Sequence, residues 1–79
     1  MNCWDKLVSS HKQVMLIEAQ KIEMMKMHLA AIKECSEEDN LMAFAYAAYT
    51  QMIENEKTLY ESMKRTLEKY ETAKNIHEE

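Results

Sequence analysis

The sequence predicts an all-α fold: an antiparallel, coiled-coil-like two-helix hairpin that is completed into a larger helical bundle by oligomerisation or by binding a partner. The chain contains neither Gly nor Pro, so the residues that best permit tight turns and positive φ are missing and helix is the remaining regular structure. Apolar residues recur at heptad spacing in both halves of the chain. At 79 residues a single hydrophobic core is only marginally stabilising, so an associated chain is expected.

The first helix is expected over about residues 3–35. Asn2 is a candidate N-cap, and Asp5 suits the positive end of the helix dipole. The heptad pattern then continues without a helix-breaking residue to about Cys35. The predicted core positions a are Val8, Met15, Ile22 and Leu29, and the positions d are Trp4, His11, Glu18, Met25 and Ile32.

The second helix is expected over about residues 37–77, after a turn near Ser36, so that residues 1–79 form one hairpin domain. Ser36 is followed by three acidic residues, a pattern close to a capping box. The two heptad frames differ by one residue, which a turn explains more simply than one continuous rod. The predicted positions a are Met42, Tyr49, Glu56, Met63, Tyr70 and His77, and the positions d are Ala45, Met52, Leu59, Thr66 and Ala73.

Folding the chain back near Ser36 pairs core layers whose residue numbers sum to 74. Each pair joins an a position with a d position, as antiparallel packing requires. The predicted layers are Trp4 with Tyr70, Val8 with Thr66, His11 with Met63, Met15 with Leu59, Glu18 with Glu56, Ile22 with Met52, Met25 with Tyr49, Leu29 with Ala45, and Ile32 with Met42.

Each helix carries more apolar residues than the seam of one hairpin can bury. We predict that these extra residues form two partner-binding stripes on opposite sides of the hairpin, because exposing both in a monomer would favour aggregation. A symmetric homodimer that forms a four-helix bundle and a groove for a different partner both remain open. Eight Met residues fit either a core or an adaptable interface. The predicted binding residues are Leu7, Val14, Ile17 and Met24 in the first helix and Tyr46, Ile53, Tyr60 and Leu67 in the second.

Three polar residues fall inside the predicted seam. Glu18 and Glu56 share one layer, where facing carboxylates would repel each other if desolvated. We expect both to reach water and to specify the register, with a docking point for a partner's Lys or Arg as the alternative. His11 lies opposite Met63, and its surroundings lack the convergent ligands of a metal site.

The sequence predicts no catalytic, cofactor-binding or metal-binding residues. Cys3 and Cys35 would lie about 48 Å apart along one helix, given the rise per residue of an α-helix, so both are expected to be free thiols. No Gly-rich phosphate loop or nucleophile with an adjacent base is present. The protein is therefore expected not to be an enzyme.

Charge and hydropathy exclude two classes of partner. Residues 36–79 carry ten acidic against five basic residues, which disfavours contact with nucleic acid or an anionic membrane. No apolar stretch is long enough to cross a bilayer and no secretory signal is visible, so a cytoplasmic location is expected.

The pattern indicates a protein that works by binding other helices. The first hypothesis is an interaction module that acts as a regulator, inhibitor or chaperone by packing its apolar flanks against a helical partner. The alternative is a self-assembling homo-oligomeric scaffold. A second alternative is an acidic decoy of a nucleic-acid-binding protein that uses Glu54, Glu61, Glu68 and Glu71.

Overall fold

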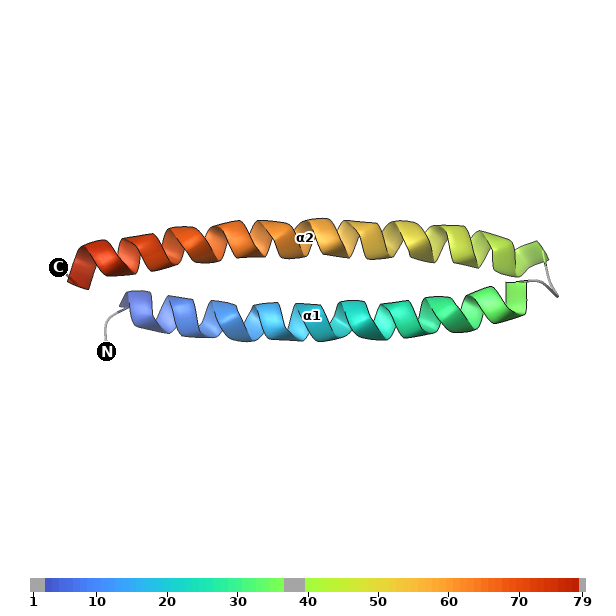
Figure 1. Ribbon diagram of the computed structural model, residues 1–79, viewed down its shortest axis with the longest axis horizontal. Coiled ribbons are helices and arrows are strands. Elements are labelled where there is room, and N and C mark those ends of the chain that lie inside the picture. The colour runs from blue at the N-terminus through green and yellow to red at the C-terminus, as the bar shows by residue number, and fades with distance from the viewer. Residues whose placement is uncertain (1–2, 37–39, 79) are drawn as a thin grey trace.

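The protein is a hairpin of two long helices packed side by side in opposite directions (Figure 1). The computed structural model describes residues 3–36 and 40–78, and all of them are helical. Helix α1 spans Cys3–Ser36 and helix α2 spans Asn40–Glu78. The predicted all-α hairpin is confirmed. Ser36 still belongs to α1, so its predicted role as the cap of the second helix is wrong; the predicted cap Asn2 and acidic residues 37–39 lie outside the described residues.

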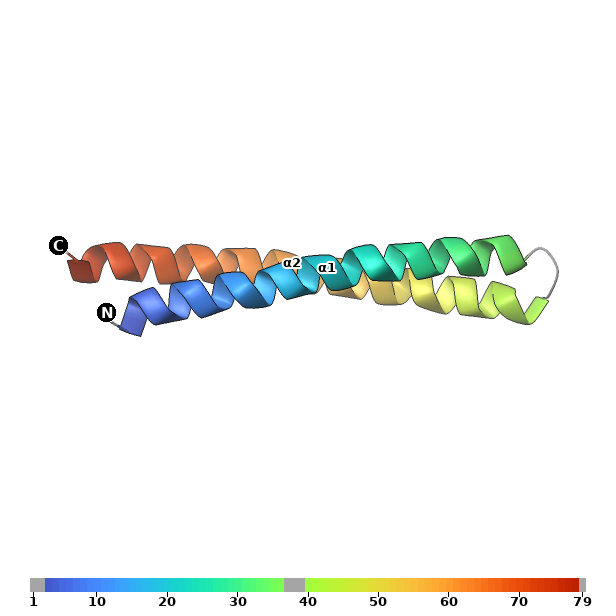
Figure 2. The ribbon, with the colours of Figure 1, turned by 90° about the horizontal axis from the view of Figure 1, so that it is seen from below.

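The hairpin is long and thin. Its principal extents are 61 × 16 × 11 Å and its radius of gyration is 18.0 Å, against about 12 Å for a compact domain of this length. The two helices wind around each other and cross near the middle (Figure 2). Because only two helices pack together, no large side chain among the described residues is completely buried.

Contacts between the helices confirm the predicted register at two layers near the open end, where α1 begins and α2 ends. The rings of Trp4 and Tyr70 lie 6.3 Å apart. His11 Nε2 donates a hydrogen bond of 2.8 Å to the carbonyl oxygen of Met63, which requires the tautomer with its proton on Nε2. Both pairs sum to 74, as the folding-back of the heptads predicts.

The predicted inner face of α1 is confirmed. Its buried residues fall at heptad positions a and d, and together they form most of the core of the hairpin. These residues are Val8, Met15, Ile22, Met25 and Ile32, together with Glu18.

The prediction of which face of α2 contacts α1 is wrong, because α2 is rotated about its own axis relative to the predicted orientation. Ile53, placed outside the seam, is only 4% exposed, whereas Met52 and Leu59, placed inside it, are 47% and 45% exposed. Around Ile53, the face that contacts α1 therefore lies between positions a and e instead of between a and d. With 100° per residue in an α-helix, this is a rotation of about 50°. Toward the ends of α2, the d residues Ala45 and Thr66 are half-buried like the residues at position e.

The sizes of the competing side chains explain the rotation. At position d, Ala45 and Thr66 offer little apolar area, while the neighbouring e positions hold Tyr46 and Leu67. Burial free energy grows with the apolar area removed from water. Turning α2 toward position e therefore buries the larger set, and Tyr46 and Leu67 are both half-buried.

Candidate functional site

The outer flank of α1 is apolar and exposed to solvent. Leu7 and Val14 lie at heptad position g and Ile17 and Met24 at position c, on the flank next to the buried d positions, and all four are exposed. Ile17 is 63% exposed and Met24 is 70% exposed. Their exposure agrees with the heptad pattern, and their role in binding stays a prediction.

The exposed apolar residues of α2 lie beside those of α1. A shallow hollow of about 650 Å³ is lined by Ile17, Met24 and His28 from α1 and by Met52 and Glu56 from α2, among others. A second hollow of about 370 Å³ continues toward the turn, where Cys35 faces Met42 and Ala45. His28 lines both hollows, so they form one continuous surface.

Exposed apolar residues at position d of α2 therefore lie on the same side of the hairpin as the predicted stripe of α1. The rotation of α2 is the reason, because it withdraws Ile53 into the seam and leaves Met52 and Leu59 facing outward. Of the predicted α2 stripe, Tyr60 lines a hollow on the other side of the hairpin, as the predicted opposite placement of the two stripes requires. We call this surface the apolar side. It comprises Leu7, Val14, Ile17 and Met24 of α1 and Met42, Met52 and Leu59 of α2.

The four residues predicted to bind a partner from α2 lie in or next to the seam. Ile53 is buried, and Tyr46, Tyr60 and Leu67 are half-buried. The prediction that these four form an outward stripe is wrong. Met52 and Leu59 are the α2 residues that sequence reasoning missed, and comparing apolar size at positions d and e could have found them.

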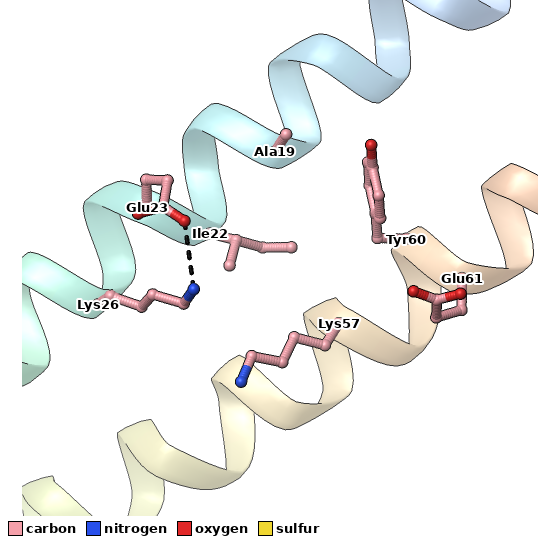
Figure 3. A pocket seen from close by; sticks show the side chains of 7 residues that line it. All are labelled: Ala19, Ile22, Glu23, Lys26, Lys57, Tyr60 and Glu61. Atoms are coloured by element: carbon pink, nitrogen blue, oxygen red, sulfur yellow. Dashed lines mark hydrogen bonds and ion pairs between the residues drawn. The ribbon is translucent and has the colours of Figure 1, made fainter.

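The opposite side of the hairpin is charged. A smaller hollow there is lined by Glu23 and Lys26 of α1 and by Lys57, Tyr60 and Glu61 of α2, together with Ala19 and Ile22 (Figure 3). Lys26 pairs with Glu23 at 3.2 Å across its edge. Residues 24 and 26 point about 200° apart around α1, so the two hollows face opposite directions. Four of the seven residues that line this hollow are charged, against two of the nine that line the large hollow on the apolar side.

An acid pair and a lysine lie at the middle of the hairpin. Glu18 is 7% exposed, so the expectation that it reaches water is wrong. Lys21 Nζ binds Glu56 Oε1 at 3.0 Å. Glu18 Oε1 and Glu56 Oε2 are buried without a donor. Because two ionised carboxylates offer only acceptors, these oxygens are satisfied when one proton is shared between them.

The surroundings shift the pKa values of Glu18 and Glu56 in opposite directions. The hydrogen bond with Glu56, burial and repulsion from the Glu56 carboxylate raise the pKa of Glu18 above its ordinary value of 4.5, and Lys21 opposes that shift. The hydrogen bonds from Glu18 and Lys21 lower the pKa of Glu56. When the pair carries one proton, these opposite shifts favour Glu18 as the acid that holds it and Glu56 as the carboxylate that binds Lys21.

No protein-family model, curated protein or solved structure matches this chain. Within residues 3–36 and 40–78, no three His, Cys, Asp or Glu side chains gather to hold a metal ion. Neither described helix combines the length and the apolar content needed to span a membrane. The features of the described residues that could serve a function are the apolar side and the acid pair beside it.

Proposed function

We propose that this protein is a protein-interaction module that packs the apolar side of its hairpin against helices of another polypeptide chain. The observation that carries the proposal is that exposed apolar residues of both helices, Ile17 and Met24 of α1 and Met52 of α2, line one hollow on one side of the hairpin. Moving even four large apolar side chains from water into an interface contributes about 1.5–3 kcal/mol each. That sum exceeds the contribution of the exposed ion pairs on the charged side, at about 0–1 kcal/mol each.

The composition of the apolar side supports a helical partner. Met24, Met42 and Met52 are unbranched and adapt their shape to a neighbour. The only strong charges lining the larger hollow, Lys21 and Glu56, already neutralise each other. A long, shallow and nearly uncharged surface suits the apolar face of an amphipathic helix.

The acidic-decoy alternative receives no support from the geometry of α2. Glu54 pairs with Lys57 at 3.4 Å, and Glu61 pairs with Lys64 at 3.6 Å. A surface that mimics a nucleic acid needs unneutralised negative charge. We also propose a cytoplasmic location, because the two free thiols, Cys3 and Cys35, fit a reducing compartment.

The test compares two neighbouring substitutions of the same kind. Ile17→Glu places a charge on the apolar side, whereas Leu16→Glu, at a residue that is 53% exposed, places it about 100° away. Chains that copurify with the tagged protein, including untagged copies of itself, should be retained by Leu16→Glu and lost with Ile17→Glu. Equal retention by both variants, with normal helicity, would refute the proposal.

A further inference from the structure

The hairpin exposes more surface than a compact chain of its mass, by an amount comparable with a protein–protein interface. The chain exposes 6110 Å², whereas a compact monomer of 9.4 kDa exposes about 5,000 Å². The difference of about 1,100 Å² exceeds the roughly 800 Å² that each partner contributes to a standard interface. Covering about that much of the hairpin with a second chain would bring its exposed surface close to that of an ordinary folded chain.

Charges along the apolar side change from one end of the hairpin to the other. Arg65, Glu68 and Lys69 line a hollow on α2 near the open end and give it a net positive charge. Lys6 lies on α1 at the same end. Toward the turn, the border of the apolar side on α1 carries an acid, Glu34. Lys6 and Glu34 are heptad-equivalent to Gln20, which lines the large hollow, so both border the apolar side.

This polarity fits a copy of the same chain turned end for end. Basic open ends would then lie over acidic turn ends at both extremities of the interface, whereas two copies in the same orientation would place like charges together. We infer that the apolar side is covered by a second copy of this chain, related by a two-fold axis across the middle of the hairpin. The product is an antiparallel four-helix bundle, and the inference rests on the proposed function.

The symmetry determines which residues meet. Each α1 lies over the α1 of the second copy, because a two-fold axis that crosses the hairpins superposes like helices in opposite directions. With the two α1 helices fully overlapped, residue n of one copy faces residue 39 − n of the other. Glu34 then lies beside Lys6 of the second copy. Lys21 lies over the second copy's Glu18–Glu56 layer, which adds a cation above the acid pair and favours this register.

The two natural cysteines can be used to test the antiparallel arrangement of the two copies. Cys3 is heptad-equivalent to Ile17, and Cys35 lines the hollow next to Met42. Both thiols are exposed and lie at opposite ends of one helix, about 48 Å apart at the α-helical rise. In the antiparallel pair each Cys3 lies next to Cys35 of the second copy, one residue from direct opposition.

The first measurement is the mass of the purified protein by light scattering over a range of concentrations. We expect twice the 9.4 kDa of one chain for the wild type and for Leu16→Glu, and a single-chain mass for Ile17→Glu. Met24→Glu provides a second disrupting variant should Ile17→Glu lose helicity by circular dichroism. A wild-type monomer at every concentration would overturn the inference. If that monomer still binds another chain through Ile17, the proposed function stands.

The second measurement uses a short bismaleimide crosslinker. Cys3→Ser alone and Cys35→Ser alone should give no covalent dimer, because each lacks one half of every Cys3–Cys35 pair. An equimolar mixture of the two variants, refolded together, should give a covalent dimer joined through Cys3 of one chain and Cys35 of the other. Crosslinking of either variant with itself, or none in the mixture, would overturn the antiparallel arrangement.

Discussion

The rotation of α2 makes a quantitative prediction about two adjacent residues. Ile53 is 4% exposed and faces α1, whereas Met52 is 47% exposed and faces outward. Truncating a buried Ile to Ala costs about 2–5 kcal/mol, the larger values belonging to sites that cannot collapse around the cavity. A two-helix seam is open at its sides and can collapse, so Ile53→Ala should cost about 2–3 kcal/mol.

Met52→Ala is the matched control within the same turn of helix. About half of the Met52 side chain is already in water, so truncating it should lower the free energy of unfolding of the hairpin by less than about 1.5 kcal/mol. Urea denaturation followed by circular dichroism measures both free energies of unfolding. Repeating the denaturation over a range of protein concentrations separates packing within one hairpin from packing between chains. The stability lost in Ile53→Ala should not depend on concentration, whereas any stability that Met52 contributes through an interface between chains should.

The opposite order of these two costs would refute the rotation. If position d faced α1, Met52→Ala would be the more damaging substitution and Ile53→Ala would be nearly neutral. Equal costs would also contradict the structure, since the two residues would then be equivalent in their burial.

Two further predictions concern the middle and the open end of the hairpin. Because the folded-state pKa of Glu18 is raised, the protonated acid stabilises the fold. This stabilisation is present below the ordinary pKa of 4.5 and is lost as pH rises through the raised pKa. The lowered pKa of Glu56 means that its ionised form also stabilises the fold, and this second contribution is lost as pH falls through the lowered pKa. Glu18→Gln carries an amide that donates a hydrogen bond to Glu56 without titrating, so it should raise the thermal midpoint at neutral pH and flatten the fall of that midpoint with rising pH. Glu54→Gln, at an exposed residue, is the control and should do neither. An unchanged pH profile in Glu18→Gln would count against the shared proton. Trp4→Ala removes ring contacts with Tyr70 and His77 and should cost about 2 kcal/mol. Hydrogen exchange should then accelerate at the open end and remain slow near Ile53, and uniform acceleration along both helices would contradict a local role.

The identity of the fold was readable from the sequence because it depends on local properties. The absence of Gly and Pro, together with two uninterrupted heptad patterns, leaves helix as the regular structure and a turn as the explanation of the frame shift. The register was readable too, since Trp4 and His11 meet Tyr70 and Met63 where the heptads place them. The inner face of α1 was readable as well, because at most layers of the heptad pattern one position is clearly more apolar than its neighbours.

The face of α2 was decided only when the two helices packed. Its sequence offers apolar residues at both d and e, so the heptad pattern alone gives two solutions about 50° apart. The choice depends on the total area that α1 can cover, which sums over Tyr46, Ile53, Tyr60 and Leu67 at once. The same packing buried Glu18 beside Glu56 and placed the exposed residues of both helices on one side. Burial and sidedness are properties of the pair of helices, and neither helix specifies them alone.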